Sequence, residues 1–170
     1  MRAGLSLLLF LALLAGCDED AARPRAEDPW SAFSFALLQE APAESQDRRS
    51  AWRMPSGVTV TAQRMAVSDS LVRERSVSGV ATALVRRFDL GEVDGALAQR
   101  RCAVNGIEAV CTTGWMVAPP ERGGGQWARR GVLLEIGSEI VFLEVLGPEE
   151  LGEQVDDQAD LLRRTLEVRG

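Results

Sequence analysis

The chain of 170 residues is long enough for one domain with a moderate core, and its 46% hydrophobic and 26% charged residues are typical of folded proteins. All nineteen basic residues are Arg, and without Lys or His the chain lacks the side chains of Ser-His-Asp, Ser-Lys and Cys-His nucleophile systems. The net charge of −6 opposes binding to nucleic-acid phosphates, so no nucleic-acid partner is expected.

The N-terminus has the features of an export signal. Met1-Arg2 supplies a positive charge, and the mainly apolar run of ten residues from Leu5 to Leu14 has the length of a signal-peptide core. The run is too short for a membrane-spanning helix, which needs about twenty apolar residues. The sequence Leu14-Ala15-Gly16-Cys17 follows it and resembles the lipobox of bacterial lipoproteins.

This resemblance implies cleavage between Gly16 and Cys17, and lipidation of Cys17 with a diacylglycerol and a further acyl chain such as palmitate. Two or more acyl chains hold a protein stably on a bilayer. We therefore expect a lipoprotein of the cell envelope that is anchored to a membrane and faces the periplasm, with the choice between inner and outer membrane open. The alternative is an ordinary cleaved signal in which the cysteine has no role.

The domain organisation follows from this N-terminus. Residues 1–16 are expected to form the signal peptide, residues 17–29 the lipidated N-terminus and its tether, and residues 30–170 a single α+β domain with its core in 57–168. The stretch from Asp18 to Asp28 is acidic and contains Arg and Pro without apolar periodicity, which predicts a solvated tether.

The first half of the domain contains two predicted strands and a predicted helical region. Residues 30–38 alternate in a strand-like way, although they equally suit a segment that packs over the domain, and a polar stretch runs from Gln39 to Ser50. Residues 57–67 are rich in β-branched side chains and alternate over their first half, which predicts a strand. Ser68-Asp69-Ser70 suits the cap of a helix through Phe88, and further helical turns through Leu97 are expected before Arg100-Arg101.

Two cysteines flank the strongest hairpin signal in the chain. Asn105-Gly106 lies between apolar flanks, so residues 102–111 predict two strands and a tight turn. A turn centred on Asn105-Gly106 would place Cys102 and Cys111 diagonally, and one centred on Gly106-Ile107 would place them opposite each other. Because paired cysteines in the periplasm usually form disulfides, we expect a Cys102–Cys111 bridge, with two reduced cysteines or a redox or metal role as alternatives.

The C-terminal half predicts long strands and a closing helix. Strand character continues to Val117, and after the loop at 119–125 two further strands, 132–136 and 140–146, are joined by a Gly137-Ser138 turn. Pro148 suits the first position of an amphipathic helix that runs to about Val168. Apolar residues recur on one helix face at every third or fourth position: Leu151, Val155, Ala159, Leu162 and Leu166.

This order of elements, with the Asn105-Gly106 turn, the sequence Gly-Ser-Glu-Ile-Val-Phe-Leu-Glu-Val and the final helix, resembles the PsbP-like superfamily, which includes LpqN-type and DcrB-like lipoproteins. The similarity covers roughly Gly57 to Val168 and contains no catalytic motif. It implies an α+β fold in which helices pack on an antiparallel sheet of about four to six strands, closed by the C-terminal amphipathic helix. It also implies a binding or accessory role rather than catalysis.

Few residues stand out as a functional site. Trp115 and Trp127 flank the glycine run at 123–125 and suit the borders of a ligand groove, whereas the alternative places one in the core and the other over a strand end. Five Arg-Arg pairs suit either anionic head groups and acidic partners, or solvated surfaces that neutralise nearby acidic residues. No catalytic residue, metal site or cofactor is expected, because the chain has no His and no Cys-x-x-Cys pair.

These features favour a non-enzymatic, membrane-anchored accessory protein that binds an envelope protein partner or a small apolar ligand. A purely structural envelope lipoprotein is the first alternative. A hydrolase that uses two Asp or Glu side chains is the second, since the chain has many carboxylates but no pair that stands out.

Overall fold

The computed structural model describes residues 19–66, 98–118, 120 and 123–169. The elements of the large sheet are β3 (Ala43–Gln46), β4 (Arg49–Arg53), β5 (Thr59–Ala66), β6 (Ala98–Val104), β7 (Ile107–Val117), β8 (Gln126–Ile136) and β9 (Glu139–Pro148). The small sheet consists of β1 (Arg25–Glu27), β2 (Phe33–Ala36) and β10 (Glu167–Val168). A 3-10 turn, η3 (Glu149–Leu151), leads into the helix α3 (Gly152–Thr165).

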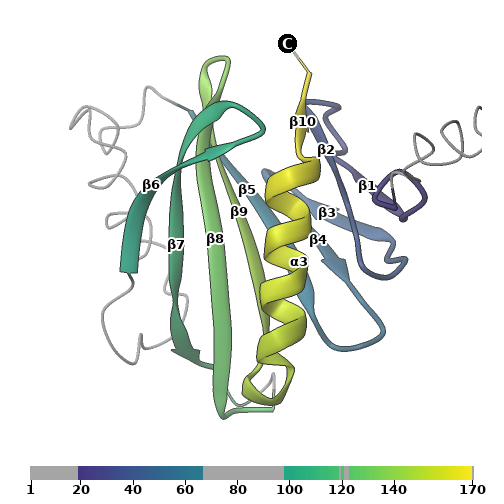
Figure 1. Cartoon of the computed structure of the whole chain (residues 1–170), viewed down its shortest axis with the longest axis vertical. Coiled ribbons are helices and arrows are strands. Elements are labelled where there is room, and N and C mark those ends of the chain that lie inside the picture. The colour runs from purple at the N-terminus through teal and green to yellow at the C-terminus, as the bar shows by residue number, and fades with distance from the viewer. Residues whose placement is uncertain (1–18, 67–97, 119, 121–122, 170) are drawn as a thin grey trace, which may run out of the picture.

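The architecture is an α+β arrangement of two antiparallel sheets and a C-terminal helix. The large sheet has the order β3-β4-β5-β9-β8-β7-β6, and the small one has the order β1-β2-β10. Figure 1 shows α3 lying across one face of the large sheet, with the small sheet beside it. Within the described residues the large sheet has seven strands, against an expected number of about four to six. The helices predicted between residues 68 and 97 lie outside the described residues.

Two tight turns predicted from the sequence are confirmed. Asn105 and Gly106 both have positive φ, 48° and 80°, and connect the paired residues Val104 and Ile107. Positive φ at both central positions defines the hairpin turn that Asn-Gly favours. Gly137, with φ of 60°, occupies the corresponding place between β8 and β9.

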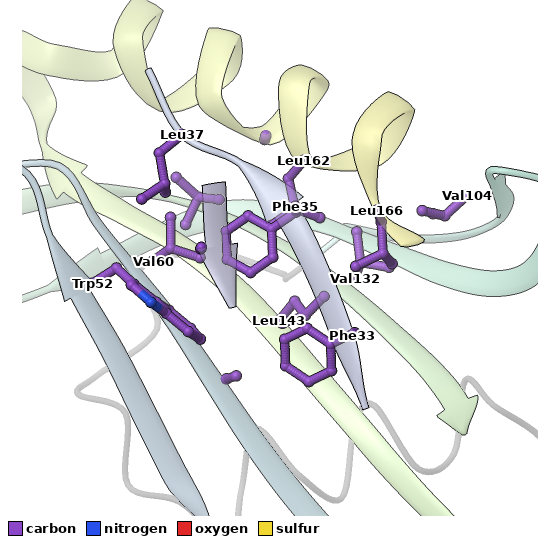
Figure 2. Packing of buried hydrophobic residues seen from close by; sticks show 14 of the residues in the cluster. Phe33, Phe35, Leu37, Trp52, Val60, Val104, Val132, Leu143, Leu162 and Leu166 are labelled. Atoms are coloured by element: carbon purple, nitrogen blue, oxygen red, sulfur yellow. The ribbon is translucent and has the colours of Figure 1, made fainter. Parts of the chain in front are cut away.

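The core lies between the large sheet and the layer formed by α3 and β2. Figure 2 shows Phe33 and Phe35 of β2 in this core, beside Leu143 of β9 and Leu162 of α3. Both phenylalanines are fully buried, and the ring of Phe35 meets that of Trp52 edge-on, with centroids 5.2 Å apart. The aromatic side chains of β2 therefore fill the space beside the helix.

The helix reaches the sheet closely because Gly147, the last residue but one of β9, has no side chain. A Cβ on Gly147 would lie 2.8 Å from Cγ2 of Val155, which is nearer than real Cβ atoms approach other atoms. Val155, Leu162 and Leu166 are buried, as the helical spacing predicts. The docking of α3 on the sheet is thus confirmed for most of the predicted face, while Leu151 is only partly buried.

A glutamine that the apolar spacing does not select also fastens α3. Gln158 is fully buried, accepts a hydrogen bond from the backbone N–H of Leu38 at 2.8 Å and donates one to the carbonyl of Ala36 at 3.1 Å. The hydroxyl of Thr165 accepts a hydrogen bond from the N–H of Ala36 at 3.0 Å. Strand β10 pairs only with Phe33 and Ser34 of β2. Side chains of α3 therefore supply hydrogen-bond partners for the backbone of Ala36 and Leu38, which follow these residues.

The segment that the sequence predicts as a solvated tether is partly folded. Arg25–Glu27 forms β1, in which Ala26 is 1% exposed, and Asp28 is 2% exposed. Further towards the N-terminus, the carboxylate of Asp20 accepts hydrogen bonds from Arg164 at the end of α3. One buried alanine between two exposed residues produces no apolar periodicity, which is why composition alone suggested a tether.

A network of ion pairs joins this segment to the sheet. Arg64 contacts Asp28 at 3.2 Å and donates to Glu139 at 2.7 Å, and its guanidinium lies 5.2 Å from the ring centroid of Trp30. Arg48 also pairs with Glu139. Burial raises the pKa of Glu139, but the hydrogen bonds from Arg48 and Arg64 outweigh it and hold that pKa below its usual range.

Three further boundaries differ from the sequence expectations. The polar stretch 39–50 contains the exposed strand β3 and the start of β4, because an edge hairpin needs no apolar face to form its ladder. Pro148 ends β9 instead of starting the helix, which begins at Gly152 after the 3-10 turn. The helix stops at Thr165 because Leu166 is extended and the next two residues pair with β2.

Candidate functional site

A cleft of about 230 Å³ lies between α3 and the face of the large sheet that the helix covers. Strands β8 and β9 lie beneath α3, and β7 and β6 extend the sheet beyond it. The residues that line the cleft are Arg100 of β6; Cys111, Thr112 and Thr113 of β7; Arg130, Gly131 and Val132 of β8; Leu143 and Val145 of β9; and Asp156, Ala159, Leu162 and Arg163 of α3. Five elements thus contribute to one hollow.

The floor of the cleft is apolar. Val132 and Leu143 are paired across β8 and β9 on the face that α3 covers, and Leu162 and Ala159 face them from the helix. All four are buried. Such a floor suits the apolar part of a ligand, since ligand pockets are largely lined by hydrophobic side chains with a few polar groups at defined positions.

A disulfide closes the sheet side of the cleft. Cys102 and Cys111 are bonded, with their Cα atoms 5.8 Å apart. Because Cys102 is in register with Ala109, the two cysteines are diagonal neighbours, as expected for a turn centred on Asn105-Gly106. The bond links β6 to β7 next to Arg100, whose register partner is Cys111.

The charged groups of the cleft are mainly arginines. Arg130 donates to both oxygens of Asp156, at 2.6 and 3.2 Å, and to the carbonyl of Gly114 at 3.2 Å. Arg163 pairs with Asp160, one helical turn away on the exposed surface. Arg100 is exposed and has no ion pair within the described part of the chain. Three guanidinium groups therefore face a single hollow.

These guanidiniums influence one another electrostatically. Burial lowers the pKa of Arg163, and the positive charges of Arg100 and Arg130 lower it further, while Asp156 opposes them. Arginine stays protonated at physiological pH. The lowered pKa therefore reflects first the burial of the Arg163 guanidinium and then its two positive neighbours, and the group stays charged.

A larger hollow of about 670 Å³ lies over β3, β4 and β5 on the opposite face of the large sheet. Its strand residues Thr59, Thr61 and Gln63 alternate with Val60 and Ala62, which point into the core. Polar and charged side chains dominate its lining. This hollow lies on one sheet face, whereas the cleft beside α3 lies between a helix and a sheet and has a buried apolar floor, so we consider that cleft the better ligand site.

The two tryptophans expected to border a groove do not lie together. Trp115 is in register with Ala128, a core residue, so it projects from the face that α3 covers, and it is 37% exposed. Trp127 precedes Ala128 on β8 and projects from the opposite face. Neither lines the cleft. Their proximity in sequence is misleading because successive strand residues alternate between the faces.

The Arg-Arg pairs separate in the same way. Arg129 is fully buried and forms an ion pair with Glu144 on the face opposite α3, whereas Arg130 enters the cleft. Arg129 therefore does not lie on a solvated surface, which was one of the two interpretations of the Arg-Arg pairs. Arg163 lines the cleft, and its neighbour Arg164 pairs with Asp20. The pair at 86–87 lies outside the described residues.

The described residues show no group of three or more Cys, Asp or Glu side chains placed to hold a metal ion. Among the same residues, no helix is long and apolar enough to cross a membrane. The charged side chains of the cleft are three arginines and one aspartate, and this excess of arginine suits the recognition of an anion.

No protein-family model matches the sequence, and the comparison with curated proteins found no match. Similarity appears in solved structures. The cyanobacterial PsbP protein CyanoP from Synechocystis sp. PCC 6803 has a TM-score of 0.61 at 8% identity, covering 86% of this chain and 92% of CyanoP. The chain has a PsbP/Mog1-like fold.

Two further proteins support this PsbP/Mog1-like fold. The Ran-binding protein Mog1p of Saccharomyces cerevisiae has a TM-score of 0.55 at 10% identity, covering 85% of this chain and 94% of Mog1p. LpqN, involved in cell envelope biogenesis in Mycobacterium tuberculosis, has a TM-score of 0.53 at 9% identity, covering 86% of this chain and 91% of LpqN. At such identities the likeness establishes the fold and leaves the ligand to be argued from the site.

Proposed function

We propose that this chain is a lipid-anchored protein of the cell envelope that acts without catalysis, as a binding or accessory protein, and that the cleft beside α3 holds its ligand. The observation that carries the proposal is the combination in that cleft of a buried apolar floor with several arginines at its polar side. Small-ligand sites usually combine a hydrophobic lining with polar groups at defined positions.

Two comparisons support the type of function. LpqN is involved in cell envelope biogenesis, and Mog1p is a Ran-binding protein. Both names describe roles that fit binding or accessory proteins, and a role outside the cytoplasm agrees with the export signal proposed for residues 1–16. Residues 17 onward then form the mature protein, with a single domain that begins close to the anchor.

The anchor is tested by mass spectrometry of the mature N-terminus. Protein recovered from the membrane fraction of its native host should begin at Cys17 and carry the mass of a diacylglyceryl group and an amide-linked acyl chain. Cys17→Ser should lose this mass and the membrane attachment. An unmodified Cys17 in the native protein would contradict the anchor.

Ligand binding is tested with a variant that fills the cleft. Ala159 is 7% exposed and lines the cleft from α3, so Ala159→Phe places a ring in the ligand space. Gln154→Phe adds the same ring at an exposed position of the same helix and serves as the matched control. Native mass spectrometry of protein extracted gently from membranes should detect a bound small molecule in the wild type and in Gln154→Phe, but not in Ala159→Phe.

The alternatives predict other outcomes in the same experiment. A purely structural lipoprotein would carry no ligand in any of the three proteins. A hydrolase that uses two carboxylates would turn over its bound molecule during incubation, so a ligand of changing mass would contradict the binding role.

A further inference from the structure

The cleft beside α3 has an excess of positive charge in a chain whose net charge is −6. Arg100, Arg130 and Arg163 line it together with one carboxylate, Asp156. Three guanidiniums against one carboxylate leave two positive charges without a partner in the lining. A partly enclosed site of this kind attracts anions more strongly than a solvated surface with the same charges.

The three arginines differ in how firmly they are held. Arg130 is fixed by both oxygens of Asp156 and by a backbone carbonyl. Arg163 pairs with Asp160, whose side chain is 59% exposed, so water already competes for this contact. Arg100 has no ion pair with another described residue. Arg100 and Arg163 can therefore accept an incoming anion while Arg130 stays in place.

The apolar floor determines what must accompany the anion. Val132, Leu143 and Leu162 lie beneath the guanidiniums and are buried. A bare anion would leave this surface unused, and a neutral apolar ligand would leave the charges unmatched. The arrangement fits a molecule that has a charged head and an apolar chain.

We propose that the cleft binds the phosphate monoester head of a membrane amphiphile, with the phosphate against Arg100 and Arg163 and the first part of its chain on the apolar floor. This inference rests on the proposed function of the cleft and names its ligand class. A phosphate monoester carries a charge of about −1.5 to −2 at pH 7, which matches the excess of two positive charges in the cleft lining. Arginine forks bind phosphate oxygens in pairs.

The position of the proposed anchor agrees with a lipid as the source of this phosphate. Asp20 lies three residues after Cys17, a separation of at most about 11 Å for an extended chain. The carboxylate of Asp20 is bound by Arg164, the neighbour of Arg163. With Cys17 lipidated, the end of α3 that carries Arg163 stays close to the head-group layer.

Four probes separate the parts of the proposed ligand. The mature chain from residue 17, with Cys17→Ser, is titrated by calorimetry with octyl phosphate, octanoate, octyl glucoside and inorganic phosphate below their aggregation concentrations. Octyl phosphate should bind at least tenfold more tightly than each of the others. Equal affinity for inorganic phosphate would overturn the amphiphile, and equal affinity for octanoate or octyl glucoside would overturn the phosphate head. Absence of octyl phosphate binding would overturn the inference as a whole.

Variants locate the binding. Arg100→Gln and Arg163→Gln should each weaken octyl phosphate binding about tenfold, and Asp156→Asn should strengthen it because a competing carboxylate is removed. Arg49→Gln removes the same charge from an exposed position on the opposite sheet face and should change nothing. An equal loss in Arg49→Gln would show that net charge alone governs binding. If Arg163→Gln fails to fold, the exposed Arg100 carries the test.

Vesicles test the source of the phosphate. Phosphatidylcholine vesicles that contain phosphatidic acid should float the mature chain with Cys17→Ser, which has no lipid anchor of its own, and vesicles of phosphatidylcholine alone should not. Binding of octyl phosphate without flotation would overturn the membrane lipid as the source. The proposed function is judged separately by native mass spectrometry. If the wild type carries a neutral ligand and Ala159→Phe does not, the cleft remains a binding site and only the inference of a phosphate head is overturned.

Discussion

Gln158 offers the sharpest test of how α3 is fastened to the rest of the fold. Its side chain is fully buried and is bonded to the N–H of Leu38 and the carbonyl of Ala36. Gln158→Ala removes both bonds and leaves the two backbone groups without these partners. Gln154→Ala makes the same substitution at an exposed position of the same helix.

The expected loss follows from the surroundings of the two backbone groups. A buried polar group without a partner costs about 1–3 kcal/mol. Ala36 is fully buried, so leaving its carbonyl without a partner should cost a free energy in the upper part of that range. Leu38 is partly exposed, so water can reach its N–H and the cost there is smaller. We expect Gln158→Ala to lower the free energy of unfolding by about 2–4 kcal/mol, a large share of the 5–15 kcal/mol typical of a domain.

Urea unfolding of the mature chain, followed by tryptophan fluorescence, measures this difference. With a slope of about 2 kcal/mol per molar urea, the midpoint of Gln158→Ala should fall by about 1–2 M. Gln154→Ala should stay within about 0.5 kcal/mol of the wild type, as exposed substitutions do. Gln158→Leu keeps most of the side-chain volume and should still lose stability, because the hydrogen bonds are absent. Equal midpoints for Gln158→Ala and Gln154→Ala would refute the role of these bonds.

Three further predictions concern stability. Leu162→Ala should cost about 2–5 kcal/mol because the side chain is 1% exposed, whereas Asp160→Ala should cost less than about 0.5 kcal/mol, and equal urea midpoints would mean that α3 is not packed on the sheet. Replacing Cys102 and Cys111 by Ala should cost about 2–3 kcal/mol by releasing a loop with a sequence separation of 9, and reductant should then have no further effect on the midpoint. The pKa of Glu139 is lowered in the folded state, so its contribution is present above the ordinary value of 4.5 and is lost as the pH falls through the folded pKa; Glu139→Gln should flatten the dependence of stability on pH in that acidic range.

The spacing of apolar residues in α3 predicts only part of its buried face. The three-or-four-residue recurrence of Val155, Ala159 and Leu162 predicts which side faces the sheet, and all three are buried. The same spacing leaves out Gln158 and Leu161, which are also buried. A second partner of the helix, β2, is separated from it by more than a hundred residues, so its effect on burial leaves no local period in the sequence.

The cleft could be anticipated only in part. Arginine pairs and the disulfide are visible in the sequence, but the convergence of Arg100, Arg130 and Arg163 depends on the register of β6, β7 and β8 and on the position of α3 over β8 and β9. Strand alternation sends Arg129 and Arg130 to opposite faces, and it separates Trp115 from Trp127 in the same way. A site built from five elements is a property of tertiary packing, which no single segment encodes.

The central claim, that the cleft beside α3 is the ligand site, is tested most directly by photo-crosslinking in living cells. A benzophenone side chain at Thr113, an exposed residue at the cleft, is compared with one at Gln46 in the hollow on the opposite sheet face. After irradiation, the Thr113 variant should gain one discrete small-molecule mass, and adding Ala159→Phe should abolish it. The same adduct at Gln46, or an adduct at Thr113 that persists with Ala159→Phe, would contradict the claim.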